Sequence, residues 1–153
     1  MSARQVSMKD VPSLQGESLG VSSAVEVSQE RINQFAEATG DHQWIHVDVE
    51  KAKESPFGGT IAHGYLTLSL VSAAMFELIE VPDADQIINY GLDKVRFMSP
   101  VPAGSSIEAS AVVRAVDECK GGYQVTVDCQ LRIPGAERPA CVAAILFRYL
   151  GEV

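Results

Sequence analysis

The three histidines of this chain lie close together in the sequence, at His42, His46 and His63, and the only tryptophan lies among them. Histidine titrates nearer to neutral pH than other side chains, so it can both take up and release protons. Asp41 precedes His46 by five positions. A carboxylate and an imidazole that share one water can remove a proton from it and return it. This stretch therefore predicts a general acid–base site built on Asp41 and His46.

The backbone between these two residues decides whether they can cooperate. In an extended segment, Asp41 and His46 would point to opposite faces, so a turn between them is required. The alternative is that Asp41 caps a loop after Gly40 and that His46 is a hydrogen-bonded, half-buried histidine without a chemical role. His42 and His46 have the spacing of two metal ligands on a helix, but Gly40 disfavours a helix here and a third ligand is needed. We therefore expect no metal.

His63 and Gly64 begin the most apolar segment of the chain, residues 61–79. A helix that is apolar on nearly every face must be buried, so we expect a long central helix here. The N–H groups of a first helical turn lack partners within the helix and lie at the positive end of its dipole. A carbonyl oxygen could approach the Gly64 N–H as in an oxyanion hole. The alternative is that Gly64 only permits close packing against a strand.

Ser72 lies eight positions after Gly64 on the same predicted helix. A hydroxyl in such apolar surroundings needs a hydrogen-bond partner. That partner is either a backbone carbonyl of its own helix or a group beside Asp41, which Ser72 would then support. Ser69 competes with Ser72 for the second role.

Other segments must position these groups. Residues 1–20 show weak periodicity and are expected to form an N-terminal arm, followed by a single domain over residues 21–153. Ser28 is a good N-cap and Gly40 a good C-terminal stop, so a helix is predicted between them. Residues 41–48 are then expected to form a loop or an extended strip.

Strands are predicted where apolar and polar residues alternate. They fall at residues 22–27, 88–97, 107–115, 123–133 and 140–149. The alternation changes phase at Asp93-Lys94, which indicates a bulge. A buried helix followed by antiparallel strands with one apolar face fits two α+β arrangements. Either the sheet curls around the helix, as in the hot-dog fold, or the helix lies on a flatter sheet.

Composition narrows the class of partner. The net charge of −8 argues against nucleic acid as the main ligand, and no basic run would attract an anionic membrane. No apolar stretch is long enough to span a bilayer, and the first 20 residues lack the apolar region of a secretory signal. Cys119, Cys129 and Cys141 are odd in number and lack metal-ligand spacing, so they are expected to be reduced thiols of a cytoplasmic protein.

Three motifs, taken in order, resemble the MaoC-like dehydratases, the family of R-specific enoyl-CoA hydratases. The first resembles the family's segment Gly-Asp-x-Asn-Pro-(aliphatic)-His-x-Asp, with Gln43-Trp44 in place of Asn-Pro. The second resembles the aliphatic-x-His-Gly start of a central helix, and the third a strand that leads into a Pro-Val-x-x-Gly turn. The matching residues are 35–48, 59–66 and 89–104. The resemblance is closest to the NodN-like branch.

This resemblance implies a single hot-dog domain, usually in a homodimer whose two sheets join edge to edge. It also implies reversible syn hydration of a trans-2-enoyl-CoA to an (R)-3-hydroxyacyl-CoA. On the family's pattern, Asp41 and His46 activate the water that attacks C3, and a proton is delivered to C2. The Gly64 amide would polarise the thioester carbonyl, and Ser72 matches a serine that supports the aspartate.

The remaining site residues follow from the same resemblance. Gln43 is expected to replace the family's asparagine, His63 to support the start of the helix, and Trp44 and Tyr65 to line the acyl tunnel. No cofactor is expected, because an acyl-CoA or acyl-carrier-protein thioester is itself the activated substrate. Because coenzyme A is polyanionic, a local basic patch is expected, and its candidates are Lys94, Arg96, Arg114 and Arg148, among which the sequence does not choose. Two alternatives are a hot-dog acyl-CoA thioesterase and a non-catalytic acyl-thioester binding protein.

Overall fold

A curved antiparallel sheet forms the body of the molecule in the computed structural model, which describes residues 2–152. Met1 and Val153, at the outer ends of the expected arm and domain, lie outside the described residues. The strand order is β2-β6-β7-β8-β5, and β3 pairs with β6. The strands are β2 (Ser18–Val21), β3 (Val25–Glu26), β5 (Gln86–Phe97), β6 (Ser106–Cys119), β7 (Gly122–Arg132) and β8 (Cys141–Leu150).

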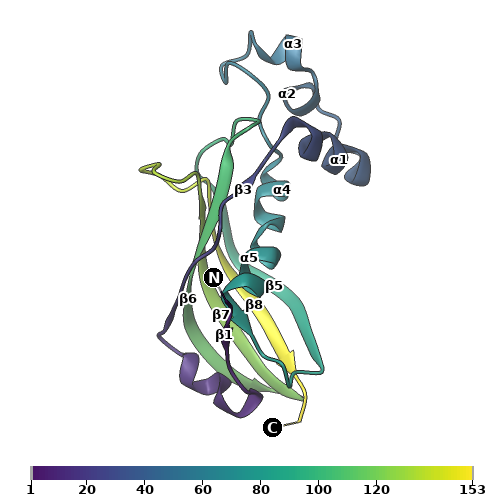
Figure 1. Cartoon of the computed structure of the whole chain (residues 1–153). Helices are drawn as coiled ribbons and strands as arrows, with labels where there is room; N and C mark the ends of the chain where they lie inside the picture. The colour runs from purple at the N-terminus through teal and green to yellow at the C-terminus, as the bar shows by residue number, and fades with distance from the viewer. Residues whose placement is uncertain (1, 153) are drawn as a thin grey trace.

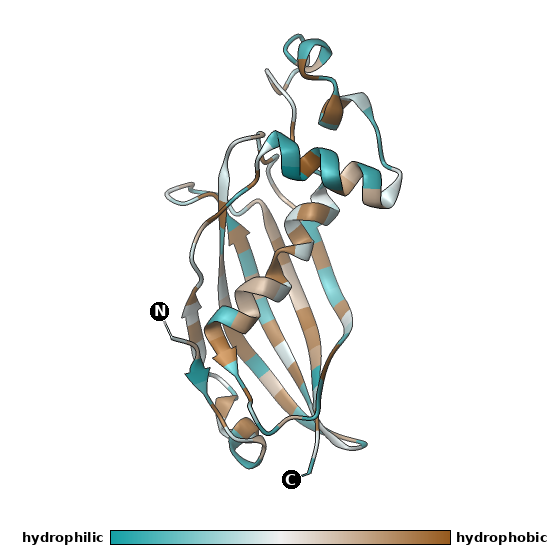
Figure 2. Ribbon diagram, turned by 45° about the vertical axis from the view of Figure 1, so that its right-hand side comes forward, coloured by the Kyte–Doolittle hydropathy of each residue, from teal (hydrophilic) through white to brown (hydrophobic). Residues whose placement is uncertain are grey.

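Two consecutive helices, α4 (Gly64–Ser69) and α5 (Val71–Leu78), lie across the concave face of this sheet (Figures 1 and 2). The apolar faces of β6, β7 and β8 cover them, because every second side chain of a strand points to the same side. Buried residues on these faces include Ile107, Ala109, Ala111, Val113, Tyr123, Val125, Val127, Cys129, Leu131, Cys141, Ala143, Ile145, Phe147 and Tyr149. This arrangement confirms the predicted hot-dog fold.

The central helix is shorter than predicted and is interrupted. It begins at Gly64, because Ile61 instead forms a bridge with Pro102 and the Ala62 N–H donates to the Val101 carbonyl. At Leu70 the N–H is shared between the carbonyls three and four residues earlier, at 3.3 Å each, which separates α4 from α5. The expected continuous helix over 61–79 was wrong at this start and at this break, because apolar composition does not reveal where an extended segment gives way to a helix.

The first 20 residues pack onto the domain. A 3₁₀ helix over Met8–Leu14 buries Met8, Val11 and Leu14 in the same apolar core as the strands. Side chains three positions apart share one face of a 3₁₀ helix, so this spacing forms an apolar edge. The short strand β1 (Arg4–Gln5) pairs with β4 (Ile79–Glu80), and β2 joins the main sheet. The segment expected to be an arm therefore contributes to the core.

Three helices lie beyond one end of the sheet (Figure 1). They are α1 (Gln29–Thr39), α2 (Trp44–Val47) and α3 (Val49–Ala52). The predicted caps of α1 are confirmed, since the Ser28 hydroxyl accepts from the Arg31 N–H and Gly40 adopts a left-handed conformation with φ of 81°. Residues 41–48 were expected to be a loop or an extended strip. That expectation was wrong for α2, where the His46 N–H donates to the Gln43 carbonyl and closes a helical turn.

Strand β5 forms one edge of the sheet, and its side chains are largely exposed. Its register with β8 shifts between Leu92 and Lys94, which confirms the predicted bulge, and again between Asn89 and Gly91. Each bulge inserts one unpaired residue, so the alternation of side chains between the two faces of the sheet shifts by one residue beyond it. Within residues 2–152, no helix has the length and apolar character needed to cross a membrane.

Candidate functional site

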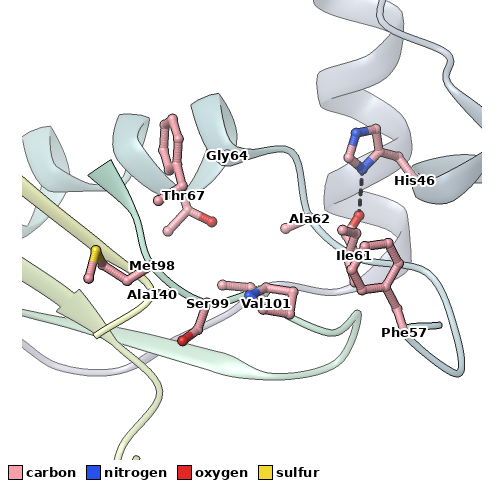
Figure 3. A pocket seen from close by; sticks show the side chains of 12 residues that line it. His46, Phe57, Ile61, Ala62, Gly64, Thr67, Met98, Ser99, Val101 and Ala140 are labelled. Atoms are coloured by element: carbon pink, nitrogen blue, oxygen red, sulfur yellow. Dashed lines mark hydrogen bonds between the residues drawn. The ribbon is translucent and has the colours of Figure 1, made fainter. Parts of the chain in front are cut away.

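Helix α2 places His46 at the junction between the overhanging helices and the start of α4. The imidazole is buried, and its Nδ1 lies 2.7 Å from the carbonyl oxygen of Ile61 (Figure 3). A carbonyl oxygen can only accept a hydrogen bond, so Nδ1 must carry the proton. The neutral ring then has an unprotonated Nε2. The Ile61 carbonyl therefore holds His46 in the tautomer that a general base needs.

Asp41 lies directly after the C-cap of α1 and is exposed. Its side chain accepts a hydrogen bond from the Gln43 N–H at 3.3 Å, so it begins the turn into α2. One carboxylate oxygen of Asp41 and one ring nitrogen of His46 lie within 4.8 Å of each other. Two hydrogen bonds of about 2.8 Å can span that distance through one water. The turn that the acid–base prediction required is thus supplied by the helical turn of α2.

His63 is more deeply buried than His46, with 2% of its surface exposed, and it contacts both members of the pair. Its ring stacks on that of His46, with centroids 3.9 Å apart and planes 24° apart. Its Nε2 lies 2.9 Å from the backbone carbonyl of Asp41 and must donate to it. The Nδ1 atom of His63 is buried without a hydrogen-bond partner among the described residues. His63 thus joins the Asp41 backbone to the His46 ring.

The ligand atoms of Asp41, His46 and His63 are close enough together to suggest a metal site. The ring orientations argue against it. The lone pair of an imidazole nitrogen lies in the plane of the ring, so two nearly parallel stacked rings direct their lone pairs side by side. A tetrahedral zinc ion needs donors that converge on one point at about 2.0–2.1 Å. Convergence would require the rings to rotate and to lose their hydrogen bonds to Ile61 and Asp41.

A cavity of about 270 Å³ lies beside His46 (Figure 3). Its wall is mostly apolar and includes Gly64, Thr67, Phe97, Met98 and Val101. Gly64 is the first residue of α4, where the N–H has no partner within the helix. Among the described residues, the cavity thus brings together an imidazole, the glycine at a helix start and mostly apolar walls, an arrangement that can hold an apolar molecule with one polar end.

Gly64 also permits close packing against a strand, which was the alternative role expected from the sequence. A Cβ atom built on this glycine would lie 3.1 Å from ring carbons of Phe97 on β5. That distance is tighter than an ordinary carbon–carbon contact of about 3.5–4.0 Å. The absence of a side chain at Gly64 therefore allows the aromatic ring to pack directly on the helix start.

Other predicted site residues lie away from this cavity. Trp44 is partly exposed beneath the Lys51 ammonium, and Tyr65 is 71% exposed, with its ring edge against Phe97. Neither lines the cavity, where both were expected as tunnel residues. Gln43 is exposed and contributes its backbone N–H to Asp41. Ser72 is half-buried on α5, outside the cavity wall.

The expected CoA-binding cations divide into two groups. Lys94, Arg96 and Arg114 line one groove of about 550 Å³ over β5, β6, β7 and β8, where Arg114 is paired with Asp128. Arg148 instead stacks its guanidinium on the ring of Tyr90, 3.4 Å from the centroid. Three of the four candidate CoA-binding cations therefore lie in one groove, which the sequence alone did not indicate.

Sequence reasoning missed the backbone carbonyl of Ile61 and the side chains of Gln29 and Thr60. The Gln29 amide donates to the His46 carbonyl at 2.8 Å, and the Thr60 hydroxyl donates to the Gln29 amide oxygen. These groups carry no motif of their own. Only their positions beside His46 in the folded chain identify them.

Comparison with known proteins places this sequence and fold among characterised relatives. The MaoC like domain matches residues 10–131. The 3-hydroxyacyl-thioester dehydratase Z of Mycobacterium tuberculosis H37Rv is 46% identical over 145 residues, covering 94% of this chain and 96% of that protein. Nodulation protein N of Rhizobium leguminosarum bv. viciae is 47% identical over 146 residues, covering 91% and 88%. A solved Archaeoglobus structure, described as a monoamine oxidase regulatory protein, has a TM-score of 0.79 and 26% identity, with both chains covered completely.

Proposed function

This chain belongs to the MaoC-like dehydratase family and is a hydro-lyase, and from that premise we propose that it adds water reversibly to trans-2-enoyl thioesters. The product is the (R)-3-hydroxyacyl thioester. The observation that carries the proposal is that the Ile61 carbonyl fixes the tautomer of His46, while a ring nitrogen of His46 lies within 4.8 Å of a carboxylate oxygen of Asp41. A carboxylate and a neutral imidazole around one water are the groups that hydration requires.

The proposed reaction assigns one role to each of these groups. The enoyl thioester lies in the cavity with its carbonyl oxygen toward the Gly64 N–H. A water held by Asp41 and His46 loses a proton to this pair while its oxygen forms a bond to C3. The electrons of the C2–C3 double bond move toward the thioester carbonyl, where the N–H stabilises the developing enolate. The pair then returns the proton to C2 on the same face, which balances the addition of one water.

The cavity and the reaction need no cofactor, and we propose that none takes part. The thioester makes C2 acidic, and the side chains supply the proton transfers. The substrate is an acyl-CoA or acyl-carrier-protein thioester. For a CoA substrate, the groove that holds Lys94, Arg96 and Arg114 supplies cations for the phosphate groups.

We propose that two copies of the chain pair through β5. This strand has a neighbour on one side only, and Ile88, Tyr90 and Leu92 on it are each at least 39% exposed. Exposed edge strands offer unpaired backbone groups to another chain. Exposed Tyr65 and Phe76 extend the apolar surface onto the helices.

The decisive experiment follows the loss of enoyl-thioester absorbance with crotonyl-CoA. We expect Asp41→Asn and His46→Ala to lower kcat by about 10²–10⁴-fold each, the usual contribution of a general acid or base. His42→Ala is the matched control, because this histidine is exposed and its side chain pairs with the exposed Glu37 at 3.5 Å, away from the cavity. Turnover that survives both site substitutions would exclude the pair. Release of free thiol from acyl-CoA would favour a thioesterase, and binding without chemistry would favour a non-catalytic thioester-binding protein.

A further inference from the structure

The side-chain amide of Gln29, the first residue of α1, makes three hydrogen bonds. Its Nε2 donates to the His46 carbonyl at 2.8 Å and to the Asn33 side chain at 2.9 Å, and its Oε1 accepts from the Thr60 hydroxyl. The His46 carbonyl can only accept, so the amide nitrogen must face it. Both N–H groups and the oxygen of the amide are therefore engaged, and its orientation is determined by its partners.

These hydrogen bonds lie on both sides of the bond between His46 Nδ1 and the Ile61 carbonyl, which orients the imidazole. Thr60 is buried and directly precedes Ile61, whose carbonyl accepts from His46 Nδ1. The Ile61 N–H in turn donates to the Ile45 carbonyl at 3.0 Å. Gln29 lies on α1 and binds the segments on both sides of the bond between His46 and Ile61. It holds the backbone that carries the ring and, through Thr60, the backbone that carries the ring's acceptor.

We infer that Gln29 is a positioning residue for His46, and this inference rests on the proposed hydratase function. Gln29 and Thr60 do not line the catalytic cavity, so they act through His46 and not on a short substrate. A displacement of about 1 Å in a reacting group can cost on the order of 10²-fold in rate. Loss of the amide contact therefore lowers kcat, whereas KM for a short enoyl thioester stays near its original value.

The chain offers closely matched variants. Gln29→Glu keeps the size of the side chain and an acceptor for Thr60, but places an oxygen against the His46 carbonyl. Thr60→Val removes the hydroxyl that anchors the amide without changing the shape of the side chain, and Thr60→Ser restores the hydroxyl. Asn33→Ala removes the third partner of the amide and leaves the bond to His46 in place. Gln29→Glu removes both bonds that the amide nitrogen donates, to His46 and to Asn33, whereas Asn33→Ala removes only the second, so the difference between the two variants reports the bond to His46.

Two measurements test the inference in the full-length protein. With crotonyl-CoA, we expect Gln29→Glu and Thr60→Val to lower kcat by about 10-fold to 100-fold, with KM within about twofold, while Thr60→Ser and Asn33→Ala stay near wild type. In proton NMR, the His46 Nδ1–H is protected from exchange in wild type and Asn33→Ala, and loses protection in Gln29→Glu and Thr60→Val.

The outcomes separate the two claims. An inactive wild type with the expected NMR pattern overturns the proposed function and leaves the positioning of His46 supported. Unchanged kcat and unchanged Nδ1–H protection in Gln29→Glu overturn the inference, whatever the activity of the wild type. If Gln29→Glu does not fold, Thr60→Val decides the question with the same two measurements.

Discussion

The imidazole of His46 stacks on that of His63, with ring centroids 3.9 Å apart and planes 24° apart. His63 also donates to the backbone carbonyl of Asp41, so one buried side chain contacts both members of the proposed acid–base pair. The three histidines thus have different surroundings. His46 lines the cavity, His63 is buried against the His46 ring, and His42 is at the surface.

His63→Phe tests the hydrogen bond separately from the stacking, because phenylalanine keeps a ring and loses the donor. We expect kcat to fall by at least about 10-fold, since the Asp41 backbone loses its anchor. The free energy of unfolding should fall by about 0.5–1.5 kcal/mol, the net contribution of a typical hydrogen bond. Steady-state kinetics and denaturant unfolding measure both. His42→Phe, on the exposed histidine, should change neither, and wild-type kcat in His63→Phe would contradict the positioning role.

Phe57 lines the cavity beside His46 and also a groove of about 510 Å³. Phe57→Ala removes the aromatic side chain between the two spaces, so we expect kcat/KM to rise for longer enoyl-CoAs relative to crotonyl-CoA. A series of enoyl-CoAs of increasing chain length measures this ratio. Val49→Ala is the matched control, because Val49 is equally exposed at 45% but lines only the groove. An identical chain-length profile for wild type and Phe57→Ala would refute the prediction.

Gly64→Ala should crowd the Phe97 ring, because the added Cβ would lie 3.1 Å from it. Overpacking of this kind costs about 1–3 kcal/mol, which chemical denaturation can detect. We also expect kcat to fall, since the helix start must shift relative to the cavity. Gly59→Ala is the control, because a Cβ at Gly59 would meet no atom within 4 Å and its φ is not positive. Equal stability of the two variants would show that Phe97 yields freely.

Leu92→Lys places a charge on the β5 edge, where Leu92 is 43% exposed. A buried lysine without a partner is costly, so we expect the variant to shift from dimer to monomer in light scattering. Val112→Lys is the matched control, because Val112 has nearly the same exposure, 44%, on β6 in the interior of the sheet. The β5 interface would be ruled out if Leu92→Lys remained as dimeric as the wild type.

The cysteines provide a test of the core. Burial raises the pKa of the Cys129 thiol to about 12 and that of Cys141 to about 11, from an ordinary value of 9.0. At pH 8 both are protonated and unreactive, so a thiol reagent should modify only the half-exposed Cys119 in the native protein. All three should react in denaturant. Rapid reaction of more than one thiol in the folded state would contradict this packing.

The same pKa shifts set the direction of the alkaline stability change. A thiol whose folded pKa is raised stays protonated in the folded state at pH values where the unfolded state ionises. The associated stability is fully present below pH 9.0 and declines as the pH rises toward 11 and 12. Denaturant unfolding between pH 8 and 10.5 should show this decline.

Much of the fold could be predicted from the sequence because its causes are local. Ser28 and Gly40 bound α1 through their own backbone and side-chain preferences, and the alternating residues of β6, β7 and β8 identify one apolar face. The curling of the sheet around the helix, as opposed to a flat sheet beneath it, did not follow from periodicity. It depends on how whole strands pack, and the family resemblance supported it.

Only the tertiary structure decided how the site is assembled. Asp41 and His46 were identified from residue type and spacing, but His46 obtains its tautomer from Ile61, 15 residues away, and its backbone support from Gln29, 17 residues away. Asp41 is held by His63, which lies 22 residues further along the chain. Backbone carbonyls and an ordinary glutamine have no motif to mark them. Their roles arise from contacts that exist only after α1, α2 and the start of α4 have packed together.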